Sequence, residues 1–397
     1  MGITRREVLL SAGIATVAGA LPGLRDAQAV ESSSGGMGPE LACLTDFEPI
    51  AKLKMPSPAW EYISGAAGDE LTVRWNREAY EKLRLKPRIL VDVASLDTSV
   101  NLFGTVHPFP ILLAPTAYHK LVHPDGEFAT ARGAGAAGAT LVVSSFATST
   151  VEDIAAVAGG PLWFQLYVQR DRGFTRALVQ RAEAAGYRAL CVTVDAPLSG
   201  PRNREDRIGF DLPKGMDEAN LRGLNTSGVK LADSARRPAE RSIYTLQSDP
   251  ALSWKDIEWI RSFAKVPVLL KGVLNPDDAD RAARSGVAGI IVSNHGGRDL
   301  DTAPATAEAL PRVADKVAGR MPVLVDGGIR RGTDVLKALA LGASAVLIGR
   351  PYLYGLSVGG AAGVTRIVEI LRAELEMAMG LTGRPTLKSI DRSVLWT

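Results

Sequence analysis

Short, strongly apolar runs recur along the chain at a steady pitch from residue 110 onward. They are rich in Val, Ile and Leu and lie at residues 111–114, 141–144, 162–166, 190–194, 268–270, 290–292, 323–325 and 346–348. Near-continuous apolar runs are typical of strands buried on both faces, as in parallel sheets covered by helices. The pattern therefore predicts eight parallel strands.

Segments with helical spacing of their apolar positions lie between these runs, and most end at a glycine suited to a helix terminus. Helices are predicted at residues 127–137, 151–158, 174–185, 276–285 and 333–341. Eight strand and helix units predict an α/β protein with a closed (β/α)8 TIM barrel. A doubly wound sheet is the alternative, but it requires a Gly-rich turn after the first strand, and the segment APTA (114–117) has none.

Two segments do not follow this alternation of strands and helices. Residues 45–108 predict an N-terminal helical cap with short extended pieces. About sixty polar residues rich in Gly, Pro and Arg separate Val194 from a helix that starts near Trp254. Connections of this length in compact domains are often active-site lids. This one has no apolar stretch that could enter a bilayer, so we expect a lid over the active site and no membrane insertion.

The N-terminus has the layout of a secretory signal. The pair Arg5-Arg6 precedes an apolar stretch to Leu24 and a small-x-small cleavage site, AQA (27–29). The paired arginines resemble the twin-arginine type, which predicts export to the periplasm. The expected organisation is a signal peptide at 1–29, a flexible leader at 30–44 and the catalytic domain at 45–397.

Composition and charge narrow the choice of partners. Hydrophobic residues make up 46% of the chain and charged residues 22%, as in an ordinary globular protein. The 46 basic and 43 acidic residues nearly cancel, so nothing points to nucleic acid. Two cysteines, Cys43 and Cys191, exclude a disulfide framework.

Polar residues follow the predicted strands at the edge where barrel enzymes place their chemistry. The last two strands end in DGGIRRG (326–332) and GR (349–350), which supply unhindered backbone N–H groups and cations and predict a phosphate site. Lys271, at the end of the fifth strand, requires a buried anion or a polar cofactor edge. The electron-rich N1 and C2 carbonyl region of a reduced flavin meets that need.

His295 is one of four histidines and lies at the end of the sixth strand. We expect Asp195 to orient its imidazole and raise its basicity, and Arg298 to hold a substrate carboxylate beside it. His107, His119 and His123 are interpreted as structural. A metal site is the rival interpretation, but no second histidine or carboxylate shows ligand spacing, so no metal is predicted.

Seven motifs carry a resemblance to a known family over the whole predicted catalytic domain. They are YISGA (62–66), APTA (114–117), FQLY (164–167), KGV (271–273), SNHGGR (293–298), DGGIRRG (326–332) and GRP (349–351). The sequence resembles the FMN-dependent 2-hydroxy-acid oxidases and dehydrogenases, such as glycolate oxidase, lactate oxidase and mandelate dehydrogenase.

The resemblance implies site residues by position. FMN is held at its ring, ribityl chain and phosphate by Thr116, Ala117, Ser144, Gln165, Thr193, Lys271, Ser293, Asp326, Gly328, Arg330, Gly349 and Arg350. The substrate is bound by Tyr62, Tyr167, Arg202, His295 and Arg298. The catalytic residues are His295, Asp195, Tyr167 and Arg298. Tyr118 and Phe146 are expected to line the pocket for the substrate side chain, with packing against the lid as the alternative.

The implied reaction oxidises a small L-2-hydroxy acid, with His295 removing a proton while two electrons pass to the flavin, as hydride or through a carbanion. Oxygen or an electron-transfer acceptor then reoxidises the flavin. The resemblance also implies a homo-oligomer, a tetramer. Two alternatives stay open: another FMN-dependent barrel enzyme, such as an isomerase of a phosphorylated substrate, and a flavin-binding protein without turnover.

Overall fold

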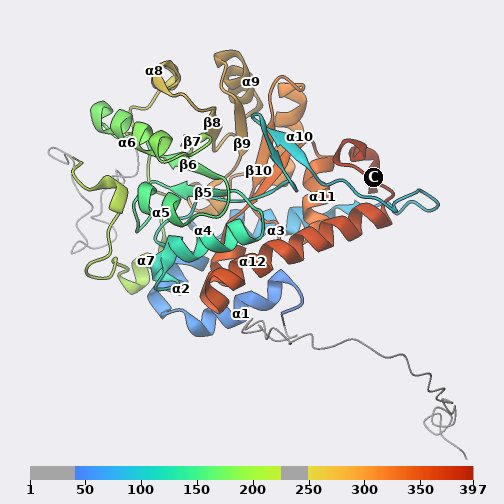
Figure 1. Ribbon diagram of the computed structural model, residues 1–397, viewed down its shortest axis with the longest axis horizontal. Coiled ribbons are helices and arrows are strands. Elements are labelled where there is room, and N and C mark those ends of the chain that lie inside the picture. The colour runs from blue at the N-terminus through green and yellow to red at the C-terminus, as the bar shows by residue number, and fades with distance from the viewer. Residues whose placement is uncertain (1–40, 225–248, 397) are drawn as a thin grey trace, which may run out of the picture. The chain divides into compact units, whose positions relative to one another are not determined.

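A closed barrel of eight parallel strands forms the centre of the protein (Figure 1). The computed structural model describes residues 41–224 and 249–396. The strands are β4 (Ile111–Leu113), β5 (Leu141–Ser144), β6 (Leu162–Leu166), β7 (Leu190–Thr193), β8 (Val268–Lys271), β9 (Gly289–Val292), β10 (Val323–Asp326) and β11 (Ala345–Ile348). They pair in chain order, and β11 pairs with β4 to close the ring. The eight predicted strands are confirmed, and a doubly wound sheet is wrong.

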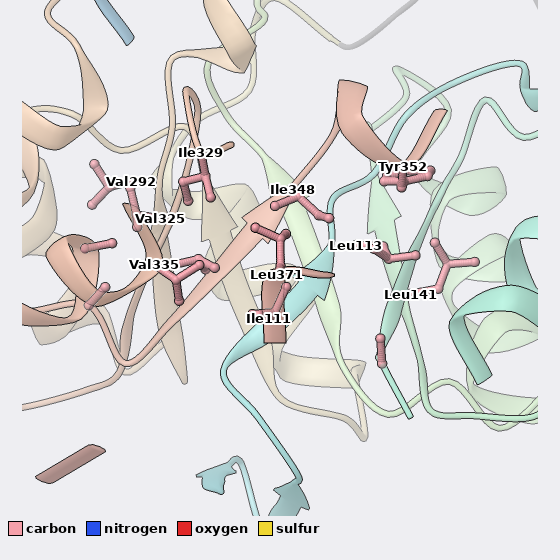
Figure 2. Packing of buried hydrophobic residues seen from close by; sticks show 14 of the residues in the cluster. Ile111, Leu113, Leu141, Val292, Val325, Ile329, Val335, Ile348, Tyr352 and Leu371 are labelled. Atoms are coloured by element: carbon pink, nitrogen blue, oxygen red, sulfur yellow. The ribbon is translucent and has the colours of Figure 1, made fainter. Parts of the chain in front are cut away.

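Side chains on each strand alternate between two apolar clusters. One fills the barrel and includes Leu112, Cys191 and Leu269, all fully buried. The other lies between the strands and the surrounding helices and includes Ile111 and Leu113, the two neighbours of Leu112 (Figure 2). Burial on both faces explains why the strands appear in the sequence as unbroken apolar runs.

The helices cover the outside of the barrel. They are α4 (Gly126–Ala136), α5 (Val151–Val157), α6 (Arg172–Ala184), α8 (Trp254–Phe263), α9 (Pro276–Ser285), α10 (Thr306–Val317), α11 (Gly332–Ala340) and α12 (Arg350–Leu381). The five predicted helices are confirmed. In the described part of the chain, no helix is both long and apolar enough to cross a membrane.

The predicted N-terminal cap is confirmed as three helices, α1 (Leu44–Lys54), α2 (Ser57–Ser64) and α3 (Leu71–Lys82). Leu41 is already buried, so the packed part of the chain begins within the predicted leader. β1 (Arg84–Leu85) pairs with β12 (Leu395–Trp396) near the C-terminus.

A hairpin of β2 (Val100–Leu102) and β3 (Thr105–His107) closes the amino-terminal end of the barrel. Phe103 at its turn packs on Trp163, with ring centroids 5.6 Å apart, and Leu102 joins the interior cluster. The functional cleft therefore opens at the opposite end, where the carboxyl ends of the strands lie.

The long connection after β7 contains a short helix, α7 (Asn203–Ile208), and then a 3-10 turn at Ala219–Leu221. Phe210, Leu212 and Met216 pack on an aromatic cluster at the barrel mouth, as expected of a lid. Residues 225–248 of this connection, the predicted signal peptide (1–29) and residues 30–40 of the predicted leader lie outside the described residues.

We predict that Leu269→Ala lowers the free energy of unfolding by about 3 kcal/mol, because it leaves a cavity inside the close-packed barrel. Leu53→Ala is the control, since Leu53 is 87% exposed and should cost almost nothing. Equilibrium denaturation in guanidinium, followed by circular dichroism, measures both changes. Equal losses for the two variants would contradict the assignment of Leu269 to the core.

Candidate active site

A cleft opens where the carboxyl ends of the strands meet. Most of the predicted site residues line it: Tyr62, Thr116, Ala117, Ser144, Gln165, Tyr167, Thr193, Arg202, Lys271, His295, Arg298, Asp326, Gly328, Arg330, Gly349 and Arg350. Asp195 and Ser293 do not line the cleft. They lie behind it and contact residues that do, as described below.

His295 lies between two carboxylates. Its Nδ1 donates to Oδ1 of Asp195 at 3.0 Å and lies 2.9 Å from Oδ2 of Asp299, as an ion pair. Burial would lower the pKa of His295, but the charges of Asp299 and Asp195 outweigh burial and raise the pKa to about 9. Burial would raise the pKa of Asp299, but His295 and Arg202 lower it to about 2. A proton taken up by this imidazole is therefore strongly stabilised.

The loop after β9 holds His295 in a left-handed backbone conformation, with φ of 56°. Such strain in a residue other than glycine persists only where the surroundings fix it. Ser293 supplies one constraint, because its hydroxyl accepts from the His295 N–H at 3.0 Å and from the Lys271 ammonium at 3.1 Å. Asn294 supplies another, through a reciprocal amide pair with Asn76 of α3 at 2.8 and 2.9 Å.

Tyr167 and Phe146 form an aromatic wall beside the histidine. The Tyr167 hydroxyl lies 3.2 Å from Nε2 of His295, and the Phe146 ring packs on Tyr167 at 4.9 Å. Phe146 lines the cleft as expected. Tyr118 follows the alternative instead and packs against the lid: its hydroxyl donates to Glu218 in the connection after β7, and its ring packs on Phe146.

The two arginines predicted to bind a carboxylate converge on the same side of the cleft. Arg298 lies over the Tyr62 ring, 4.9 Å from its centroid, and contacts Glu205 at 3.2 Å. Arg202 contacts Glu205 at 3.4 Å and Asp299 at 3.3 Å. Cations and carboxylates thus alternate along this wall, which keeps both guanidiniums charged and close together.

A row of hydroxyl and amide groups crosses the floor of the cleft. Gln165 accepts from the Ser144 hydroxyl at 3.1 Å and donates to the Thr193 hydroxyl at 2.9 Å. Lys271 was predicted to require a buried anion or a polar cofactor edge, and its ammonium lies 3.4 Å from Oδ2 of Asp326. Burial would lower the pKa of Lys271, but Asp326 and the two aspartates beside His295 raise it, so the lysine stays charged.

The predicted phosphate end joins the turn after β10 to the start of α12. Arg350 donates to the carbonyls of Ile63, Gly65 and Gly296, and Arg330 donates to the carbonyl of Ile329. Neither guanidinium has a carboxylate partner within the described ranges. The Nε of Arg330 and the Oδ1 of Asp326 are buried without a hydrogen-bond partner.

Asp299 and Glu205 are site residues that sequence reasoning missed. Asp299 follows His295 by four residues, a spacing that brings the two side chains together within one turn of chain. It also creates a group of potential metal ligands, since single atoms of Asp195, His295 and Asp299 lie within 4.8 Å of one another.

Comparison with known proteins identifies the family. A family model described as FMN-dependent dehydrogenase matches residues 51–397. The chain belongs to the FMN-dependent dehydrogenase family. It is 47% identical to an L-lactate oxidase of Nostoc sp. over 359 residues, covering 89% of this chain and 97% of the relative. It is also 44% identical to glycolate oxidase 1 of Oryza sativa subsp. indica, covering 90% and 96%.

Among solved structures, mandelate oxidase with (S)-2-phenylpropionate superposes with a TM-score of 0.80 at 39% identity. The match covers 89% of this chain and 98% of that one.

The cleft fits FMN, the cofactor of this family. The unsatisfied Nε of Arg330 requires an anionic acceptor, which a phosphate supplies, and the unsatisfied Oδ1 of Asp326 requires a donor, which a ribityl hydroxyl supplies. Lys271 would hold the N1 and C2 carbonyl side of the ring, and the row through Gln165 would face its polar edge.

We predict that His295 titrates with a pKa of about 9, and that Asp299→Asn lowers this value by about one pH unit or more, because the imidazolium loses one of its two carboxylates. The chain has four histidines, so labelling them with 15N allows direct titration by NMR. The signals of the other three should be unaffected. An unchanged His295 pKa in the variant would show that Asp299 does not act on it.

Proposed function

We propose that this protein oxidises a small L-2-hydroxy acid, similar to lactate, glycolate or mandelate, to the 2-oxo acid with FMN as its cofactor. The observation that carries the proposal is the position of His295, which is strongly basic, next to the Tyr167 hydroxyl and close to two arginines on one wall of the cleft. A phosphate isomerase would not require such a pair of arginines beside its base.

Each residue then has a defined task. Arg298 and Arg202 bind the substrate carboxylate, which fixes the α-carbon and its hydroxyl with respect to the base. His295 takes the proton in its neutral form, and Asp195 and Asp299 stabilise the imidazolium that results. Tyr167 donates a hydrogen bond to the hydroxyl oxygen. FMN, when bound, accepts the two electrons.

The relatives support both the substrate class and the acceptor. They are named as oxidases of lactate, glycolate and mandelate, so we propose oxygen as the electron acceptor, with an electron-transfer protein or quinone as the alternative. The rings of Phe146 and Tyr62, which line the cleft, favour a small or flat apolar side chain on the substrate. We also propose a homotetramer, which light scattering on the purified protein would test.

Mixing the oxidised enzyme anaerobically with L-lactate, glycolate or mandelate should bleach the flavin for at least one of them. His295→Ala should reduce the rate at least about a thousandfold while FMN stays bound, because general base catalysis is lost. His123→Ala, outside the cleft, is the control. Admitting air to the reduced enzyme should restore the oxidised spectrum and produce peroxide. Bleaching by His295→Ala at a near-normal rate would refute the assignment of the base.

We further propose that the protein is exported to the periplasm through the twin-arginine route, which carries folded proteins and would allow FMN to bind beforehand. The support is the Arg5-Arg6 pair and the cleavage site AQA (27–29). Replacing both arginines by lysine should retain the uncleaved protein in the cytoplasm. Fractionation followed by N-terminal sequencing tests this, with a mature start near Val30 expected for the unaltered chain. A mature product that still begins at residue 1 would exclude the proposal.

A further inference from the structure

We propose that Arg77, in helix α3 of the cap, binds the phosphate of FMN together with Arg330 and Arg350. The phosphate then joins the cap to the barrel, and the cap becomes part of the cofactor site as well as a cover for it. Three features support this role: the position of α3, the number of charges and hydrogen-bond donors at this end of the cleft, and the weak ion pair that otherwise holds Arg77.

Helix α3 lies directly against the glycine turn of the phosphate end. A Cβ atom on Gly328 would lie 2.0 Å from the carbonyl oxygen of Asn76 and 3.2 Å from the backbone nitrogen of Arg77. Gly328 has φ of 83°, so both its backbone conformation and this close approach require glycine. Arg77 lines the same cleft as Arg330 and Arg350.

The charge of a phosphate monoester at neutral pH is about −1.5 to −2, so one cation does not balance it. Arg350 already uses donors on three carbonyl oxygens of the cap and the His295 loop. Arg330 has a single carbonyl partner and a buried Nε without one. Arg330 and Arg350 together can balance the charge, but most of the donors that point from Arg350 are used, so a third guanidinium beside Arg330 would complete the hydrogen bonds to the phosphate oxygens.

Arg77 is available for this role. Its ion pair in the structure is with Glu48 of α1, at a long 3.7 Å, and both side chains are about one-third exposed, so the pair contributes little. Burial lowers the pKa of Arg330, and the positive charge of Arg77 lowers it further, which places the two cations near each other. An anion between them would remove this repulsion.

The test compares FMN with riboflavin, which lacks the phosphate. Arg77→Gln in the full chain should weaken FMN about tenfold, measured by the rise in flavin fluorescence on dilution of the holoenzyme. Riboflavin binding to the same apoprotein should not change. Arg74→Gln is the matched control, since Arg74 lies on the same helix, pairs with Glu78 and does not line the cleft. It should leave both affinities unchanged.

Arg77→Glu should weaken FMN further and again leave riboflavin unaffected, because it places an anion beside the phosphate. Equal weakening of both flavins would mean that Arg77 only supports the cap, and would overturn the proposal. Unchanged FMN binding in Arg77→Gln would overturn it as well. Neither result depends on turnover, so the proposed reaction is tested separately.

Discussion

Closure of eight parallel strands into one ring is the constraint on which the rest of this structure depends. Because the strands are parallel, all their carboxyl ends meet at one rim, and residues far apart in the sequence become neighbours there. The hairpin around Phe103 fills the opposite end. One rim therefore carries the flavin contacts, the base and the substrate arginines.

Charge at this rim is balanced locally rather than avoided. Asp299 contacts both His295 and Arg202, and Glu205 contacts both Arg202 and Arg298. Each of these charges thus has an opposite neighbour, which offsets the cost of removing it from water. The arrangement has a chemical consequence: the imidazole binds a proton tightly, while the arginines stay charged and close to the place where a carboxylate must bind.

The strands, the helices and most of the cleft could be predicted from the sequence, because apolar runs and polar strand ends depend on local order along the chain. The residues that were missed share a different property. Asp299 lies in the loop after β9 and Glu205 in α7, and each contacts an arginine about a hundred residues away, Arg202 or Arg298, whose approach depends on how the chain folds over the rim. For Tyr118 the sequence left pocket lining and lid packing open for the same reason, since Glu218, which accepts from its hydroxyl, is 100 residues distant. The charge of Lys271 was predicted, but its pairing with Asp326 across the barrel was not.

The cap is built from the beginning of the folded chain, yet its partners come from the end. Asn76 pairs with a residue 218 positions later, Arg350 reaches back 287 positions to Ile63, and β1 pairs with the final strand. During synthesis, helices α1 to α3 leave the ribosome before the late segments on which they pack. They can therefore dock only when almost the whole chain has been made. Translation must therefore be nearly complete before the cofactor site can close, and the part of the protein next to the proposed export signal is among the last to reach its final position.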